Sequence, residues 1–265
     1  MQDYKIINTS YANIYESPSF TSQLVTQALF WEKIFISNKK NNWYEVKSND
    51  NYKGWVHKFY LIDPFVYETN KFLQKNDNWY WVIDPFLKLD PNFKDSTYLS
   101  FGSLIPCFKD NEYLVTLTPN NRRFVIDANS VLKYRKRINI EDVLFLYKKL
   151  IGIPYLWGGK SSFGYDCSGL IQILFNIAGY DFPRDCNEQV KSDILKEINM
   201  NELKVGNLIY FEENNITTHV GIFVNDSEFL HSSGCVKVNS IDNISKKFDK
   251  DLFKKVKGYY KVQRF

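Results

Sequence analysis

The stretch that decides the fold of the C-terminal half reads Phe163-Gly164-Tyr165-Asp166-Cys167-Ser168-Gly169-Leu170. Residues 171–178 are apolar almost all round and end at Gly179, which predicts a buried helix with a glycine C-cap. Asp166 stands where an N-cap residue is expected, so Cys167 falls in the first turn. Free backbone N–H groups and the helix dipole there favour a thiolate, the reactive form of cysteine.

A nucleophilic cysteine needs a base, and the chain has only three histidines. His219 follows a polar segment, residues 212–218, that predicts a loop, and it opens an apolar run that predicts a buried strand. His231 ends the next apolar segment. Histidines on neighbouring strands can meet at one end of a sheet and act as base and orienting partner for Cys167. The same three side chains also suit a zinc hydrolase with one open coordination position.

The composition narrows the class of protein. The 265 residues suggest two or three domains, and the net charge of +4 comes without a basic helix face, so nucleic acid is not an expected partner. No apolar run reaches the roughly 20 residues that cross a bilayer, and residues 1–5 do not begin a secretory signal. The four cysteines form no Cys-x-x-Cys pair, which favours a reducing cytoplasm. We expect no cofactor and no membrane partner.

The first half of the chain reads as short strands separated by turn residues. Strands are predicted at 5–9, 12–15, 24–28, 33–37, 43–47 and 54–57, with a polar hairpin loop at 38–42. A second set is predicted at 80–83, 97–99, 104–108, 113–118 and 123–127. So many short strands favour small barrels that close their own edges. A helical pattern then runs from 140 to 150, with Gly152 as its stop.

Two sets of sequence motifs stand out in the chain. Residues 13–18 (Asn-Ile-Tyr-Glu-Ser-Pro), 41–46 (Asn-Asn-Trp-Tyr-Glu-Val) and 52–56 (Tyr-Lys-Gly-Trp-Val) resemble a bacterial SH3-like domain. Residues 154–159 (Pro-Tyr-Leu-Trp-Gly-Gly), 166–169 (Asp-Cys-Ser-Gly), 182–185 (Phe-Pro-Arg-Asp), 205–208 (Val-Gly-Asn-Leu) and 219–222 (His-Val-Gly-Ile) resemble the NlpC family of papain-like cysteine peptidases.

The resemblance implies an α+β fold in three parts. A first SH3-like β-barrel is expected over 1–63, and a linker with a second SH3-like barrel over 64–135. The catalytic domain, papain-like and NlpC-type, is expected over 136–265, with a helix-borne cysteine packed on an antiparallel sheet.

The resemblance also implies catalytic roles. Cys167 attacks the substrate, His219 accepts the proton of its thiol, and His231 orients His219. Tyr155 and the Cys167 backbone N–H stabilise the oxyanion.

Substrate contacts are implied at six positions. Asp166 and Ser168 are expected to line the cleft, and Glu32 and Tyr52 to grip the ammonium of the substrate. Cys186 stands where related sequences usually carry a small hydroxyl or alanine, and a thiol hydrogen-bonds a substrate carboxylate poorly. Arg184 can compensate by charge-assisted pairing, or it can be a structural ion-pair partner.

Two SH3-like domains before an NlpC-type domain resemble cytoplasmic peptidases of murein recycling. Those enzymes cut γ-D-glutamyl to diamino-acid bonds in short peptides with a free N-terminal L-Ala, so a murein peptide is the expected partner. The alternatives are a cell-wall-binding protein, or a wall-remodelling hydrolase or amidase that acts on intact peptidoglycan. The sequence does not indicate an oligomeric state.

Overall fold

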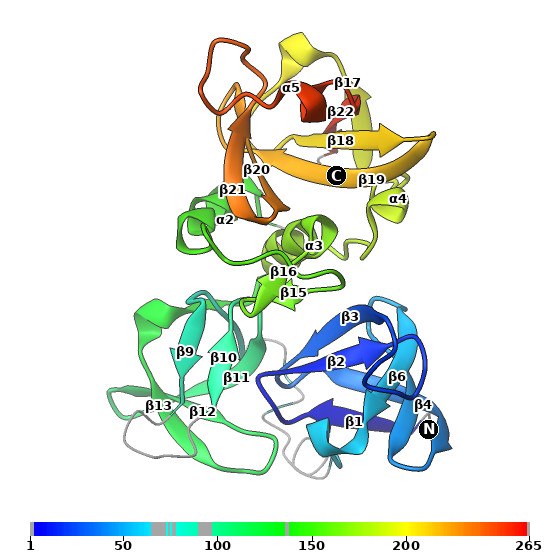
Figure 1. The fold of residues 1–265 in the computed structure, drawn as a ribbon. Coiled ribbons are helices and arrows are strands. Elements are labelled where there is room, and N and C mark those ends of the chain that lie inside the picture. Colours follow the sequence, from blue (N-terminus) through cyan, green and yellow to red (C-terminus); the bar gives the residue numbers. More distant parts are fainter. Residues whose placement is uncertain are drawn as a thin grey trace. The chain divides into compact units, whose positions relative to one another are not determined.

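The computed structural model describes residues 3–64, 73, 75, 78–89, 97–135 and 138–263. By its internal contacts the chain divides into two compact units, Met1–Lys136 with Lys160–Phe163, and Arg137–Gly159 with Gly164–Phe265. Figure 1 labels the elements of both units along the chain. The linker predicted between the two barrels falls largely on residues outside the described ranges.

A seven-stranded sheet forms the first part of unit one, in the order β3-β2-β6-β5-β4-β1-β7. Its strands are β1 (Tyr4–Ile7), β2 (Tyr11–Tyr15), β3 (Leu24–Leu29), β4 (Lys33–Lys40), β5 (Trp43–Lys47), β6 (Lys53–His57) and β7 (Leu61–Ile62), with a 3-10 turn η1 (Lys58–Tyr60) before β7. The buried side of the sheet carries small and branched apolar side chains such as Ile14 and Ile34. The hairpin loop predicted at 38–42 is shorter than expected, because β4 continues to Lys40 and Asn41 turns the chain at φ 55°.

A five-stranded sheet, in the order β13-β12-β11-β8-β14, forms the second part of unit one. Its strands are β8 (Trp79–Val82), β11 (Leu104–Asp110), β12 (Tyr113–Leu117), β13 (Arg123–Ile126) and β14 (Val131–Lys133), with η3 (Ala128–Ser130) before β14 and a separate pair of β9 (Phe86–Lys88) and β10 (Tyr98–Ser100). The sequence patterns did not predict β9 or β14. That this part is a second SH3-like barrel stays a prediction.

Trp31 joins the two parts of unit one. It packs in one apolar cluster with residues of both sheets, and its indole Nε1 donates a hydrogen bond to the carbonyl of Leu117 at 2.7 Å. The residue adopts φ 70°, a left-handed conformation that costs a non-glycine residue about 1–2 kcal/mol. Its burial and hydrogen bond offset that cost, so the two sheets share a core.

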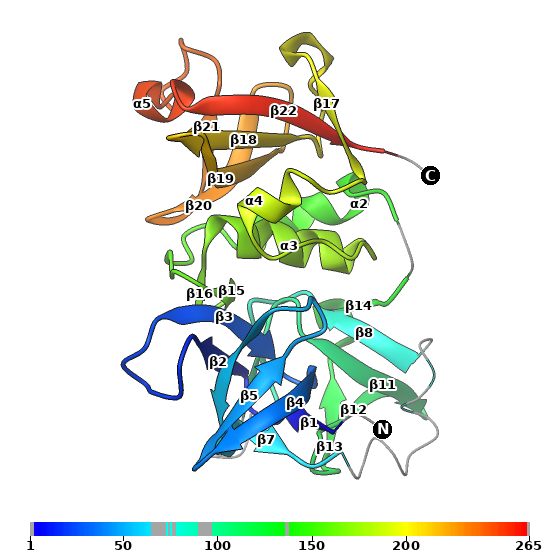
Figure 2. The same ribbon diagram turned by 90° about the vertical axis from the view of Figure 1, so that its right-hand side faces the viewer.

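Unit two is built on a six-stranded sheet in the order β17-β22-β18-β19-β20-β21, in which neighbouring strands are antiparallel. Its strands are β17 (Leu195–Ile198), β18 (Leu208–Glu213), β19 (Ile216–Phe223), β20 (Glu228–Ser233), β21 (Cys235–Ser240) and β22 (Val256–Val262). The helices are α2 (Glu141–Leu144), η4 (Phe145–Lys149), α3 (Cys167–Ile177), α4 (Cys186–Gln189), η5 (Met200–Glu202) and α5 (Lys250–Phe253), and the short strand β16 (Gly164–Tyr165) precedes α3. The short strand β15 (Lys160–Ser161), earlier in the chain, belongs to unit one. Figure 2 shows α2, α3 and α4 along one face of the sheet.

Two local predictions in unit two need correction. The helix predicted at 140–150 is α-helical only over α2 and continues as the tighter η4. The polar loop predicted at 212–218 is a tight hairpin, because Asn214 and Asn215 both adopt positive φ and turn β18 directly into β19. His219 therefore lies inside β19 rather than at its start.

None of the helices formed by the described residues is long and apolar enough to cross a lipid bilayer.

Candidate active site

Two adjacent strands bring the predicted histidines together. β19 pairs with β20 in a register that places Ile222 opposite Leu230 and Phe223 opposite Phe229. Continuing this register puts His231 opposite Gly221, two residues from His219 along β19, so both imidazoles project from the same face. The Nε2 atom of His219 lies 2.8 Å from Nδ1 of His231, and the His231 side chain is buried.

The neighbouring strand β21 fixes which nitrogens carry protons. His231 Nε2 lies 3.0 Å from the Oδ1 atom of Asn239, and an amide oxygen only accepts hydrogen bonds, so Nε2 carries a hydrogen. Burial, and then the charge of His219, lower the pKa of His231 to about 3, so its ring is neutral at ordinary pH. Nδ1 of His231 is then an acceptor for Nε2–H of His219. A neutral His219 ring has its lone pair on Nδ1, the nitrogen left for Cys167.

The Cys167 thiol lies at the first position of α3, 3.6 Å from the thiol of Cys186. A hydrogen bond from Cys186 is the largest influence on the pKa of Cys167 and lowers it; burial opposes this, and His219 adds a hydrogen bond and its charge. Together they bring the pKa down to about 5. The pKa of Cys186 is raised, first by its hydrogen bond to Cys167. Near neutral pH the thiolate is therefore on Cys167, and Cys186 keeps its proton.

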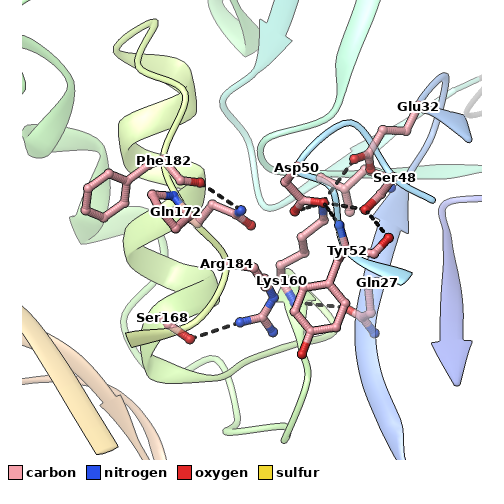
Figure 3. A network of polar contacts seen from close by, with 12 residues as sticks. Gln27, Glu32, Ser48, Asp50, Tyr52, Lys160, Ser168, Gln172, Phe182 and Arg184 are labelled. Carbon is pink, nitrogen blue, oxygen red and sulfur yellow. Dashed lines mark hydrogen bonds and ion pairs between the residues drawn. The ribbon is translucent and has the colours of Figure 1, made fainter. Parts of the chain in front are cut away.

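Asp166, the residue before the thiol, is held by a buried ion pair. Arg184 donates from Nη1 to Asp166 Oδ1 at 2.9 Å and from Nη2 to Oδ2 at 2.5 Å. Its Nη1 also donates to Ser168 Oγ at 3.0 Å (Figure 3). Asp166 also caps α3 by accepting from the Gly169 N–H at 2.6 Å. The guanidinium is buried, with 3% of the residue exposed, and it fixes the turn that presents Cys167.

The loop before α3 lies directly against the first turn of the helix. A Cβ atom on Gly169 would stand only 2.3 Å from the carbonyl oxygen of Gly159, closer than real Cβ atoms approach other atoms. The same carbonyl accepts from the Asp166 N–H at 3.0 Å. Glycine at 169 thus allows the loop to hold Asp166 and Cys167 in place.

The Tyr155 hydroxyl stays protonated in this environment. Burial, and then the negative charge of Cys167, raise the pKa of Tyr155 to about 12. Its O–H is therefore a donor at neutral pH.

The two predicted ammonium-binding residues, Glu32 and Tyr52, belong to unit one and lie beside Lys160 (Figure 3). The Lys160 ammonium is buried, 3.0 Å from Oε1 of Glu32 and 3.7 Å from Oδ2 of Asp50. Its backbone N–H donates to Gln27 Oε1 at 3.0 Å. The Tyr52 backbone N–H is 3.5 Å from Oδ1 of Asp50. Two carboxylates share one ammonium, so the cluster carries a formal charge of −1.

Sequence reasoning missed Asn239, Lys160 and Asp50. Asn239 follows His231 by eight residues, and only the β20–β21 pairing brings it back to the imidazole. Lys160 directly follows the glycine pair of the 154–159 motif, so its place beside that motif was the one available signal. Asp50 lies in a polar turn, a common setting for a solvated carboxylate, and nothing in its local sequence indicated a buried partner.

The zinc alternative finds little support in this geometry. Both ring nitrogens of His231 face other side chains, His219 and Asn239. Within the described ranges, no group of three or more His, Cys, Asp or Glu side chains is arranged to hold a metal ion.

Comparison with known proteins defines the class to which this site belongs. The chain matches the NlpC/P60 family model over residues 152–257 and the bacterial SH3 domain model over residues 10–62. It belongs to the NlpC/P60 family, a family of peptidoglycan-peptide endopeptidases of the cysteine peptidase class, and it carries a bacterial SH3 domain.

Particular relatives are known within that family. The chain is 31% identical over 219 residues to the γ-D-glutamyl-L-lysine dipeptidyl-peptidase of Bacillus subtilis (strain 168), covering 78% of this chain and 71% of that protein. It is 27% identical over 233 residues to the Bacillus cereus (strain ATCC 10987 / NRS 248) protein of the same name, covering 80% and 68%. The crystal structure of an NlpC/P60 family protein from Bacillus cereus ATCC 10987 superposes with a TM-score of 0.84 at 20% identity, over 99% of this chain and 100% of that one.

Proposed function

We propose that the protein is a cysteine endopeptidase that hydrolyses γ-D-glutamyl to diamino-acid bonds in short murein peptides with a free N-terminal L-Ala. The observation that carries the catalytic part is the directed chain of hydrogen bonds from His219 through His231 to Asn239, which leaves a basic nitrogen for Cys167. The substrate part is supported by the relatives named γ-D-glutamyl-L-lysine dipeptidyl-peptidase.

In the proposed acylation step, the Cys167 thiolate attacks the γ-carbonyl carbon and forms a C–S bond while the carbonyl oxygen becomes an oxyanion. The Cys167 backbone N–H, at the first position of α3, and the Tyr155 hydroxyl donate to that oxyanion. His219, holding the thiol proton on Nδ1, gives it to the leaving amine as the C–N bond breaks. Nδ1 of His219 then takes a proton from water as the water oxygen attacks the thioester carbonyl carbon. The C–S bond breaks, the γ-carboxyl product leaves, and Cys167 returns to the thiolate with the proton on His219.

The proposed roles of the remaining site residues divide into support and recognition. Asp166 and Ser168 border the cleft, and Arg184 holds both in place through its hydrogen bonds. Because these guanidinium donors already serve Asp166 and Ser168, the geometry favours the structural reading of Arg184 over carboxylate binding. Cys186 faces the nucleophile, and its thiol is already engaged there.

In unit one, Glu32 and Tyr52 recognise the substrate ammonium in this proposal. Asp50, the second carboxylate beside the Lys160 ammonium, joins them in this proposal. The net charge of −1 suits a single ammonium group, and an N-acylated peptide has no charge to offer. A requirement for a free N-terminus suits released peptides, so we place the enzyme in cytoplasmic murein recycling rather than on intact wall.

Product analysis tests this proposal. The purified protein is incubated with L-Ala-γ-D-Glu-diaminopimelate, with L-Ala-γ-D-Glu-L-Lys and with purified sacculi, and the products are identified by mass spectrometry. We expect L-Ala-D-Glu and the free diamino acid from the short peptides and no release from sacculi. Cys167→Ala is the control, with a rate loss of about 10⁴-fold or more and an unchanged thermal unfolding curve. Turnover by that variant contradicts a cysteine peptidase, and solubilised sacculi favour the wall-remodelling alternative.

A further inference from the structure

The second thiol beside the nucleophile lowers the pKa of Cys167 but forms no covalent bond in the proposed peptidase mechanism. Of the four cysteines, Cys107 belongs to unit one, and Cys235 lies on β21 with its thiol partly exposed. Cys167 and Cys186 are both buried, and their sulfur atoms are 3.6 Å apart. The first residue of α3 and the first residue of α4 thus present two thiols to each other.

We propose that Cys167 and Cys186 form a peroxide-reactive dithiol, in which Cys167 is oxidised first and Cys186 resolves the product to a disulfide that reversibly switches the peptidase off. The inference concerns the chemistry of the two sulfurs and holds for any peptide substrate.

The reaction balances with hydrogen peroxide as the oxidant. The Cys167 thiolate attacks one peroxide oxygen, the O–O bond breaks, and the departing hydroxide takes up a proton to become water. Cys167 is then a sulfenic acid. The Cys186 sulfur attacks the Cys167 sulfur, the S–O bond breaks, and a second water leaves with the Cys186 proton. The two thiols lose two electrons to the peroxide, and the product is a Cys167–Cys186 disulfide.

The protonation states of Cys167 and Cys186 determine which thiol reacts with peroxide. The thiolate is the form that attacks peroxide, and it resides on Cys167, whose pKa is lowered to about 5. Cys186 holds its proton while the neighbouring sulfur is negative, so it does not compete for the peroxide. The hydrogen bond to Cys167, then burial, then the charge of Cys167 raise the pKa of Cys186. Once Cys167 is a neutral sulfenic acid, the effects of the thiolate are gone and only burial remains, so the proton of Cys186 is released more easily and its sulfur can attack.

The geometry allows the bond with a small movement. A disulfide needs its sulfurs about 2.05 Å apart, so the present 3.6 Å must shorten by roughly 1.5 Å. Cys167 is fixed by α3 and by the Asp166 N-cap. Cys186 begins a helix of only four residues, α4, which follows irregular chain from Gly179 to Asp185. We therefore expect α4, rather than α3, to move.

Peptide mapping tests the proposal directly, because Arg184 provides a trypsin site between the two cysteines. Trypsin places Cys167 in the peptide 161–184 and Cys186 in the peptide 185–191. The full-length protein is treated with hydrogen peroxide, its free thiols are alkylated in denaturant, and the digest is analysed without reduction. We expect the two peptides to be joined with the loss of two hydrogens, while Cys107 and Cys235 are found alkylated.

The variant Cys186→Ser supplies the matched comparison, because its hydroxyl can donate a hydrogen bond but cannot form a disulfide. In this variant we expect peroxide to drive Cys167 to the sulfinic acid, which dithiothreitol does not reverse. Dithiothreitol should return most of the activity of peroxide-treated wild type, each protein being compared with its own untreated sample. Cys107→Ser should leave the joined peptide unchanged.

Two results of the peptide mapping would overturn the proposal. Sulfinic acid on Cys167 at equal rates in wild type and Cys186→Ser, without the joined peptide, overturns the proposal. A joined peptide containing Cys107 or Cys235 in place of Cys186 also overturns it. The mass readout needs no substrate, so a wrong assignment of the peptide substrate would appear in the product analysis and leave this result intact.

Discussion

His219 donates through Nε2 to Nδ1 of His231 across 2.8 Å, and the two rings stand on adjacent antiparallel strands. The contact makes the two residues unequal, since one ring exchanges the proton and the other holds it in orientation. We expect His219→Ala to lose nearly as much kcat/KM as Cys167→Ala, and His231→Ala to lose less. Steady-state assays of the three variants on one peptide check the order. Wild-type activity in His219→Ala would show that another group is the base.

Asn239 ends the chain of hydrogen bonds, and its removal should affect the rate more than binding. In Asn239→Leu the buried Nε2–H of His231 loses its acceptor at a cost of about 1–3 kcal/mol, and the orientation of His219 loosens. We expect kcat to fall with little change in KM. Asn239→Asp, which keeps an acceptor oxygen, should recover much of the rate. A wild-type kcat in Asn239→Leu would refute the assignment of protons in the histidine pair.

The acid side of the pH profile should report on Cys186. The thiolate form of Cys167 is present above its pKa, which is lowered to about 5, so kcat/KM should fall as the pH drops through that value. Cys186→Ala removes the hydrogen bond that lowers this pKa most, so the acid limb should move to higher pH. In Cys186→Ser the shift should be smaller, because the hydroxyl still donates. Superimposable acid limbs in wild type and Cys186→Ala would disprove the role of this hydrogen bond.

We expect Arg184 to contribute mainly to the stability of the fold rather than to substrate binding. Arg184→Met leaves the carboxylate of Asp166 without its partner in a buried setting, which costs about 3–5 kcal/mol in the free energy of unfolding. Arg184→Lys keeps the charge without the paired donors and should lose less. Urea unfolding of wild type, Arg184→Met and Arg184→Lys measures the loss in the free energy of unfolding for each variant. A loss within about 0.5 kcal/mol, the usual range for surface sites, would contradict a structural role.

Recognition of the ammonium predicts a strong preference for free N-termini. An N-acetylated peptide brings no ammonium charge to the cluster, and we expect this to lower kcat/KM by more than about a hundredfold, which corresponds to about 3 kcal/mol. We would compare free and N-acetylated L-Ala-γ-D-Glu-diaminopimelate with wild type, Glu32→Gln and Tyr52→Phe. Equal rates for the two peptides with wild type would rule out this recognition.

The Glu32 result needs a control, because the same carboxylate pairs with Lys160. Thermal unfolding of Glu32→Gln separates a loss of selectivity from a loss of structure. If discrimination persists unchanged in Glu32→Gln but falls in Asp50→Asn, then Asp50 is the residue that meets the ammonium and the assignment of Glu32 is wrong.

Much of the secondary structure could be predicted from the sequence, because short stretches of residues determine helix ends and strand alternation. The apolar run after Cys167 and the glycine beyond it predicted the extent of α3, and Asp166 occupies the expected N-cap. Alternation of apolar residues predicted most strands of unit one. The hairpin between β18 and β19 was read as a loop because its residues are polar. Paired asparagines at positive φ make such a turn much shorter than composition suggests.

The polar partners were harder to predict because they depend on pairing between segments. Asn239 reaches His231 only through the register of β20 and β21. The sequence position of Cys186 indicates a substrate contact, but its distance from Cys167 is set by how α4 packs beside α3. Such distances arise from tertiary packing, which no local motif encodes.

The register between β19 and β20 has a consequence for how this protein tolerates change. Side chains alternate between the two faces of a strand, so a slip of one residue in this hairpin would turn one imidazole away from the other. The same slip would turn the other side chains of the displaced strand to the opposite face, so core packing and the His219–His231 hydrogen bond depend on one register. Insertions in the turn at residues 224–227 should therefore be accepted only when they bulge outward and leave the pairing in place. Catalytic activity is thus a sensitive assay of correct strand alignment in this hairpin.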